Sequence, residues 1–137
     1  MITTATVGAT FVQAAHLLAT HLADHASSLP EPVCLEVISR AHQSRLTVQV
    51  PSMTVPEVAS EVLAWADTLT TVTVQAWRPP TGDRVHLSMA SALSGPAGTV
   101  DLVIFGGADH DPVLVGDLAP GEYRAVTIGE LRRWAMR

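Results

Sequence analysis

In three consecutive stretches of the sequence, at residues 71–78, 84–93 and 99–105, apolar residues recur at alternate positions. This alternation gathers the apolar side chains of an extended segment on one face and is typical of a β-strand. Turn-forming residues at 79–83 and 95–98 separate the stretches. The pattern predicts an antiparallel three-stranded meander with one buried face, formed by Val72, Val74, Ala76, Val85, Leu87, Met89, Val100, Leu102 and Ile104.

Helical spacing is found on both sides of the meander. Thr54 and Glu57 have the Thr-x-x-Glu form of a capping box, and apolar residues then recur at the helical period, which predicts a helix over 55–68. A similar apolar stripe predicts a helix over about 9–27, and a second Thr-x-x-Glu box at Thr127 predicts a short C-terminal helix. We expect Trp65 and Trp134 to lie in the core.

Two further strands, at 33–38 and 46–50, are predicted to form a hairpin. The segment 106–125 is rich in Gly, Pro and Asp, so we expect a long surface connection there. The predicted fold is therefore α+β in the order α-β-β-α-β-β-β-α, with residues 1–137 as one domain. It is a two-layer sandwich in which an antiparallel sheet, hairpin plus meander, carries the helices on one face.

Composition limits the class of protein. The chain has 137 residues, 47% of them hydrophobic and 15% charged, which is too apolar for a disordered protein. No apolar run approaches the roughly 20 residues that span a bilayer, and no basic segment precedes the first apolar stretch, so we expect neither a membrane span nor a secretory signal. The single cysteine, Cys34, cannot form an internal disulfide and is expected to be a buried strand residue. We expect a cytoplasmic protein.

The chain has no lysine and no asparagine, a bias typical of a GC-rich bacterial genome. Without lysine there can be no Schiff base and no phosphate-loop lysine, and we expect no cofactor. The net charge is −5, and the only cluster of cations, Arg132, Arg133 and Arg137, falls in the predicted C-terminal helix. We therefore do not expect nucleic acid as a partner, because binding it depends on many cationic contacts to phosphate.

Two groups of residues could hold a metal ion. Asp109, His110 and Asp111 follow two glycines, and such a loop could form a metal site, although Asp and Gly before a proline are also ordinary turn residues. His21 and His25 have the i, i+4 spacing of a zinc protease but lack the glutamate that must follow the first histidine. The Asp109-His110-Asp111 loop supports the alternative function, a small metal-dependent hydrolase.

The second face of the meander is the stronger functional candidate. Alternation places on it Gln75, Trp77, Arg84, His86 and Phe105. Aromatic residues and arginine are enriched where proteins bind each other. The competing interpretation is a solvated face whose aromatic side chains are covered by 106–125. We expect a non-enzymatic binding, regulatory or assembly module that contacts a protein partner or associates with itself.

Overall fold

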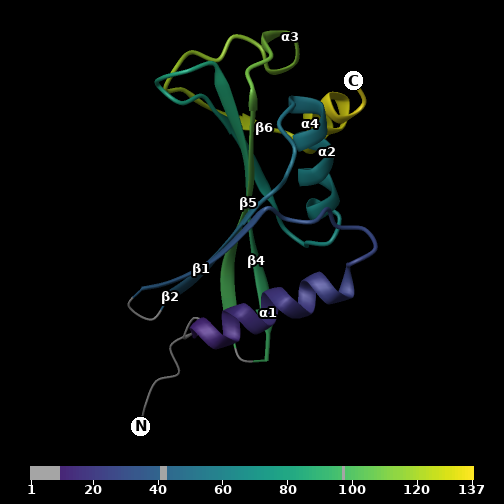
Figure 1. Cartoon of the computed structure of the whole chain (residues 1–137), viewed down its shortest axis with the longest axis vertical. Helices are drawn as coiled ribbons and strands as arrows, with labels where there is room; N and C mark the ends of the chain where they lie inside the picture. The colour runs from purple at the N-terminus through teal and green to yellow at the C-terminus, as the bar shows by residue number, and fades with distance from the viewer. Residues whose placement is uncertain (1–9, 41–42, 97) are drawn as a thin grey trace.

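Four helices and six strands make up the part of the chain that the structure, a computed structural model, describes: residues 10–40, 43–96 and 98–137. The elements follow one another as α1 (Phe11–Asp24), β1 (Cys34–Arg40), β2 (Gln43–Gln49), α2 (Val55–Ala66), β3 (Thr73–Trp77), β4 (Arg84–Gly95), β5 (Gly98–Asp109), α3 (Pro112–Val115), β6 (Tyr123–Val126) and α4 (Ile128–Ala135). The predicted α+β class is confirmed, and Figure 1 shows the sheet beside its helices.

The six strands form one sheet in the order β1-β2-β5-β4-β3-β6. The predicted hairpin is β1–β2, and the predicted meander is β3–β4–β5, paired antiparallel throughout. The sheet as a whole is mixed, because β2 pairs with β5 in parallel, and the prediction of a wholly antiparallel sheet is wrong on this point. Since β3 then runs in the same direction as β2, the chain between them must cross over the sheet. The segment containing α2 makes this crossover.

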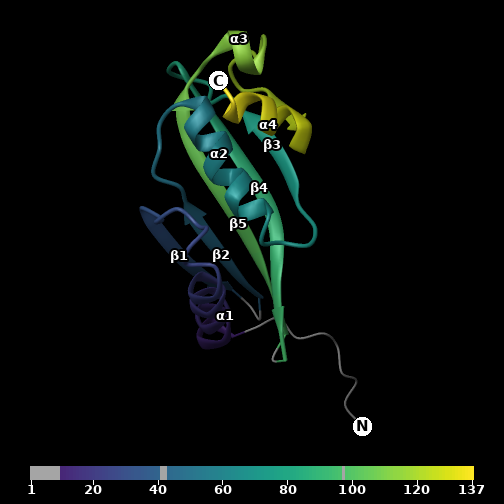
Figure 2. The ribbon, with the colours of Figure 1, turned by 90° about the vertical axis from the view of Figure 1, so that its right-hand side faces the viewer.

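The main helices cover a single face of the sheet, as predicted. A Cβ atom added to Gly106 would lie 2.7 Å from a methyl carbon of Val58 in α2, and one added to Gly95 would lie 2.7 Å from a methyl carbon of Leu17 in α1. Gly106 in β5 and Gly95 in β4 each lie an even number of positions from the buried residues of their strand, and therefore on the same face as those residues. The helices α1 and α2 thus pack on the same face of the sheet. Figures 1 and 2 show the two helices at different ends of the long β4–β5 pair, with α4 beside α2.

The core lies between that face and the helices. Burial of apolar side chains is the main favourable term in folding, and here it joins the predicted face of the meander to the apolar sides of the helices. Trp65 and Trp134 are 0% and 3% exposed, which confirms their predicted core positions. Thr54 and Thr127 cap α2 and α4 by accepting hydrogen bonds from the backbone N–H groups of Glu57 and Glu130, as their sequence patterns predict.

The segment 106–125 differs from the predicted long connection. Gly106–Asp109 continues β5, a short helix follows, and Tyr123 begins the additional strand β6, which pairs with β3. At Gly106 the absence of a side chain has a packing reason, because an added Cβ would lie 2.6 Å from Val50 and 2.7 Å from Val58. The connection beyond the sheet runs from residue 110 to residue 122 and contains α3.

Some predictions fall on residues outside the described ranges. These are the N-terminal stretch on which the signal prediction depends, residue 9 of the first predicted helix, part of the hairpin connection, and Ala97 in the turn after β4. Within the ranges that the structure describes, no helix combines the length and apolar character needed to cross a membrane.

Candidate binding face of the sheet

The face of the sheet opposite the helices carries all five residues predicted for binding. Trp77 stands directly across from His86, Gln75 stands across from Ser88, and Ser88 stands across from Phe105. Arg84 lies two residues from His86 and therefore on the same face. We call this surface the open face. Its location is that expected from the sequence, and the binding role of its residues stays a prediction.

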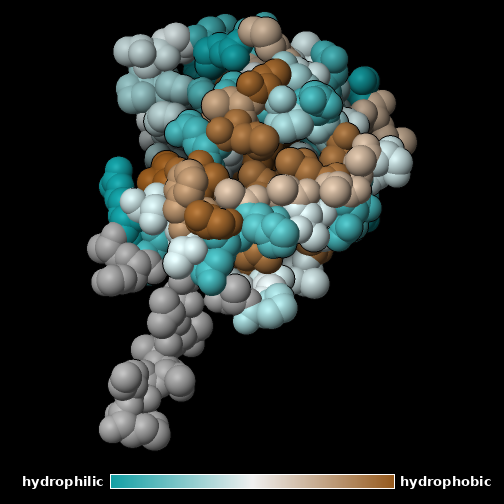
Figure 3. All heavy atoms as spheres, turned by 60° about the horizontal axis from the view of Figure 1, so that its bottom comes forward, coloured by the Kyte–Doolittle hydropathy of each residue, from teal (hydrophilic) through white to brown (hydrophobic). Residues whose placement is uncertain are grey.

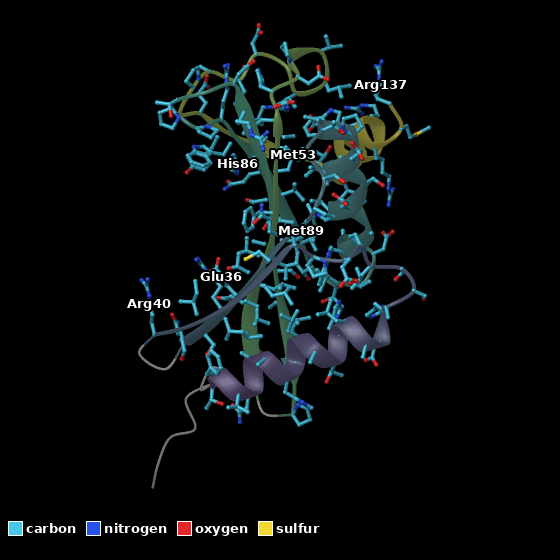
Figure 4. All side chains as sticks on the ribbon, viewed as in Figure 1. Glu36, Arg40, Met53, His86, Met89 and Arg137 are labelled. Carbon is cyan, nitrogen blue, oxygen red and sulfur yellow. The ribbon has the colours of Figure 1, made fainter. Side chains whose placement is uncertain are left out.

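An aromatic row crosses the open face near one edge of the sheet. The rings of Trp77 and Tyr123 stack with centroids 5.6 Å apart at 21°, and those of Trp77 and His86 lie 5.5 Å apart at 52°. Cross-strand pairing aligns the three side chains, one from each of β6, β3 and β4. Tyr123 is 61% exposed, so the row presents aromatic surface to solvent rather than to the core. Figure 4 shows His86 on the side of the sheet away from α2.

Tyr123 is the member of the row that the sequence analysis missed. It lies in the segment expected to be a surface connection, four residues of which pair with β3 as β6. That segment was proposed as a cover for the aromatic residues, and Tyr123 does stack on Trp77 while remaining largely exposed. The four residues of β6 are too few for alternation to identify a strand, so the sequence carries no local signal that places Tyr123 on this face.

Gly107 continues the row beyond His86, its cross-strand neighbour. A Cβ atom added there would lie 3.0 Å from Nη2 of Arg84 and 3.4 Å from Cε1 of His86. The guanidinium and the imidazole therefore lie over the bare backbone of Gly107. Arg84 is held from its other side by Asp109, with Nη1 3.2 Å from the carboxylate. The row thus ends beside an exposed ion pair.

The charge state of His86 follows from this arrangement. Partial burial lowers the pKa of the imidazole from its ordinary value of 6.5, and the nearby positive charge of Arg84 lowers it further. The neutral form therefore predominates near pH 7. A neutral ring can donate one hydrogen bond and accept one, and its apolar face remains available for stacking.

A shallow depression of about 530 Å³ adjoins the aromatic row toward the other end of β3. Its lining combines small and polar side chains of the open face with apolar residues at the start of β3 and the end of β6: Val72, Thr73, Val74, Gln75, Ser88, Ala90, Ala125, Val126, Thr127 and Ile128. The open face is therefore not flat. A protruding side chain of a partner could enter the depression while its neighbours contact Trp77 and Tyr123.

The candidate metal loop is engaged in other contacts. Asp109 pairs with Arg84 on the open face, and the carboxylate of Asp111 accepts hydrogen bonds from Val113 and Leu114 N–H to cap α3. His110 separates the two acids, and its backbone N–H donates to the carbonyl of Asp83. Across residues 10–40, 43–96 and 98–137, no three His, Cys, Asp or Glu side chains are arranged to hold a metal ion.

The histidine pair lies on α1, away from the open face. His21 and His25 are in contact on α1, with ring centroids 4.6 Å apart, and His21 also stacks on the core residue Trp65. Cys34 was expected to be a buried strand residue, and this expectation is wrong. It is exposed because it begins β1, the outermost strand of the sheet.

Comparison of the chain with protein-family models, with curated proteins and with solved structures finds no match.

Proposed function

We propose that this protein is a non-enzymatic binding module, in regulation or assembly, whose open face contacts a protein partner around Trp77. The observation that carries the proposal is the row of exposed Tyr123 and half-buried Trp77 and His86, arranged by ring contacts and cross-strand pairing. Rigid aromatic side chains lose little conformational entropy on binding, and they are common at interface hot spots.

The charges of the open face favour a protein over a nucleic acid. Arg84 is paired with Asp109, and Arg45 stands across from Asp101 in the register of β2 and β5. These two cations therefore have acidic neighbours, and Arg40, on β1, is a third cation of this face, whereas a nucleic-acid surface needs many cations free to contact phosphates. The net charge of −5 also disfavours binding to nucleic acid.

The single cysteine supports placing this activity in the cytoplasm. Cys34 is exposed and has no second cysteine in the chain with which to pair. An exposed free thiol persists most readily in a reducing compartment.

Site-specific photo-crosslinking in the native host tests the proposal. A photoreactive phenylalanine analogue replaces Tyr123 on the open face, and a matched control carries it at Val113, which is 82% exposed on α3. We expect a discrete protein adduct from position 123 that disappears when Trp77→Ala is added, and none from position 113. Equal adducts at both positions, or an adduct indifferent to Trp77→Ala, would contradict the proposal. An adduct with nucleic acid would replace it with the nucleic-acid interpretation.

A further inference from the structure

The strand β1 forms one outer edge of the sheet and is unusually well suited to pair with another strand. It pairs with β2 through seven consecutive residues without a bulge, from Cys34 to Arg40, so its free edge is equally regular. It contains no Pro or Gly, residues that commonly interrupt such edges, and its two charged residues are Glu36 and Arg40. The opposite edge strand, β6, has only four residues.

The charges on β1 are arranged symmetrically about Ile38, the fifth residue of the strand. Glu36 and Arg40 lie two residues before and two residues after Ile38, and all three side chains share the open face by alternation. Both charged residues are exposed, and Figure 4 shows them on β1. The ion pairs found among the described residues join other side chains: Arg78–Asp83, Arg84–Asp109 and Arg124–Glu130.

We propose that two copies of this chain pair through β1, antiparallel about a two-fold axis that passes at Ile38. In this register Glu36 faces the partner's Arg40, Arg40 faces the partner's Glu36, and the two Ile38 side chains face each other. The two six-stranded sheets then become one continuous sheet. A two-fold axis repeats every contact, so one strand with complementary charges on either side of its centre is complementary to itself.

Charge complementarity favours this register over those in which the two-fold axis passes at a nearby residue of β1. Residues directly opposite in an antiparallel pair share a face of the sheet, so the axis must pass at a residue of β1. An axis at Val37 would place Glu36 opposite Ile38, and an axis at Glu36 would place two carboxylates face to face. An axis at Ile38 forms two opposite-charge pairs, and like charges directly opposite each other are destabilising.

Apolar surface beside the same edge also lacks cover in a single copy. Val33 and Leu35 are 59% and 45% exposed, and Phe11, at the start of α1, is 53% exposed. Figures 1 and 2 both place the N-terminal end of α1 near the β1–β2 hairpin. Figure 3, in which this end comes forward, shows apolar side chains gathered across it. A second copy seated on β1 would shield part of this surface.

The proposed contact is separate from the open-face site. The sheet order places β2, β5 and β4 between β1 and β3, the strand that carries Trp77. A pair formed through β1 therefore leaves the aromatic row accessible on both copies. The two proposals can fail independently of each other.

Charge reversal tests the pairing on the full chain by sedimentation analysis over a range of concentrations. We expect a dimer that Glu36→Arg and Arg40→Glu each weaken by about tenfold or more, since either change replaces two attractions by two repulsions. The double variant Glu36→Arg/Arg40→Glu restores the opposite charges and is expected to restore dimerisation. A monomer at every concentration, or a dimer indifferent to both single reversals, would overturn the proposal.

A cysteine crosslink tests the register. Ile38→Cys, in a Cys34→Ser background, should give a disulfide-linked dimer on mild oxidation, because the two side chains meet at the axis. Native Cys34 is the matched control. In the proposed register the Cys34 residues of the two copies are eight positions apart along the strands, about 27 Å, so no crosslink between them is expected. Crosslinking through Cys34 instead would overturn the register. A dimer dissociated by Trp77→Ala would show that the copies meet through the open face, and would overturn pairing through β1.

Discussion

The imidazole of His21 lies nearly flat on the indole of Trp65, with ring centroids 5.7 Å apart and an interplanar angle of 13°. Its Nε2 is 2.8 Å from the hydroxyl oxygen of Thr68, and that hydroxyl donates its proton to the carbonyl of Trp65. The hydroxyl therefore accepts from His21, which fixes the neutral tautomer with a proton on Nε2. Through this contact α1 is joined to the C-terminal end of α2.

Acid should weaken the fold through His21. Burial, followed by the charge of His25, lowers the pKa of this imidazole below its ordinary value of 6.5, although Asp24 opposes the shift. Above pH 6.5 both folded and unfolded states hold the neutral ring, so the full stability is present. Below pH 6.5 the unfolded state binds a proton on His21 more readily than the folded state does. The free energy of unfolding therefore falls with pH until the pH passes below the pKa that His21 has in the folded protein.

Urea denaturation between pH 7.5 and pH 5 measures this loss. His21→Gln should make the free energy of unfolding less dependent on pH, without abolishing the dependence, because burial and Arg84 shift His86 in the same direction. An unchanged slope in His21→Gln would show that this residue does not carry the effect.

Gly106→Ala should destabilise the protein by about 1–3 kcal/mol, the usual cost of overpacking a core. The added methyl group would meet Val50 and Val58 at 2.6 and 2.7 Å, where β5 lies directly under α2. Gly129→Ala is the matched control, since its nearest neighbour would be 3.8 Å away on the exposed side of α4. Chemical denaturation should show the control unchanged or slightly more stable, because alanine favours a helix.

Arg124→Met should lower stability at neutral pH by about 1–3 kcal/mol. The guanidinium joins three elements: it is 2.9 Å from Glu130 in α4, it donates at 2.6 Å to the carbonyl of Val115, and it lies over the ring of Trp134. Denaturation at pH 7, compared with the exposed control Arg132→Met, checks this cost.

The same variant should remove part of the acid dependence. The hydrogen bond from Arg124 holds the pKa of Glu130 below its ordinary value of 4.5. A carboxyl group with a lowered pKa contributes stability above its unfolded value, and this contribution is lost as pH falls through the folded value. The wild type should therefore lose more free energy of unfolding than Arg124→Met between pH 5.5 and pH 3. Equal losses would contradict the assignment.

Arg84→Ala should raise the pKa of His86, because it removes one of the two causes that lower it. Burial remains, so the pKa should stay below 6.5. An NMR titration of the His86 ring signals measures the shift. Arg45→Ala, which removes a charge from β2 on the same face, should leave the titration unchanged.

The elements that could be predicted are those whose signal is local. Trp65 and Leu87 were assigned to the core from helical spacing and from alternation, and both are fully buried. The same alternation placed Trp77 and His86 together on the opposite face. Local patterns do not encode which distant strands become neighbours, so the parallel pairing of β2 with β5 had no signal in the sequence.

The elements that were missed depend on tertiary contacts. Gly106 and Gly107 suggested a loop, yet one lies beneath Val58 and the other beneath Arg84 and His86. At position 106 glycine is required by the closeness of Val50 and Val58, whereas a Cβ at position 107 would meet the flexible end of Arg84 at 3.0 Å. Both glycines lie within a strand and not in a turn. The four residues of β6 are too few for periodicity to identify, which is why Tyr123 was absent from the predicted face.

The length of β4 and β5 bears on how the molecule opens. Each strand has twelve residues and is about 40 Å long. The helices stabilise the two ends of the β4–β5 pair separately, because α1 packs near Gly95 and α2 packs near Gly106. Opening can therefore begin at either end while the other stays packed, which makes the two ends distinct units of local unfolding. Amide protons in the middle of the pair, near Met89 and Ile104, should then exchange with solvent more slowly than those at the ends. The contact between His21 and Trp65 couples the two units.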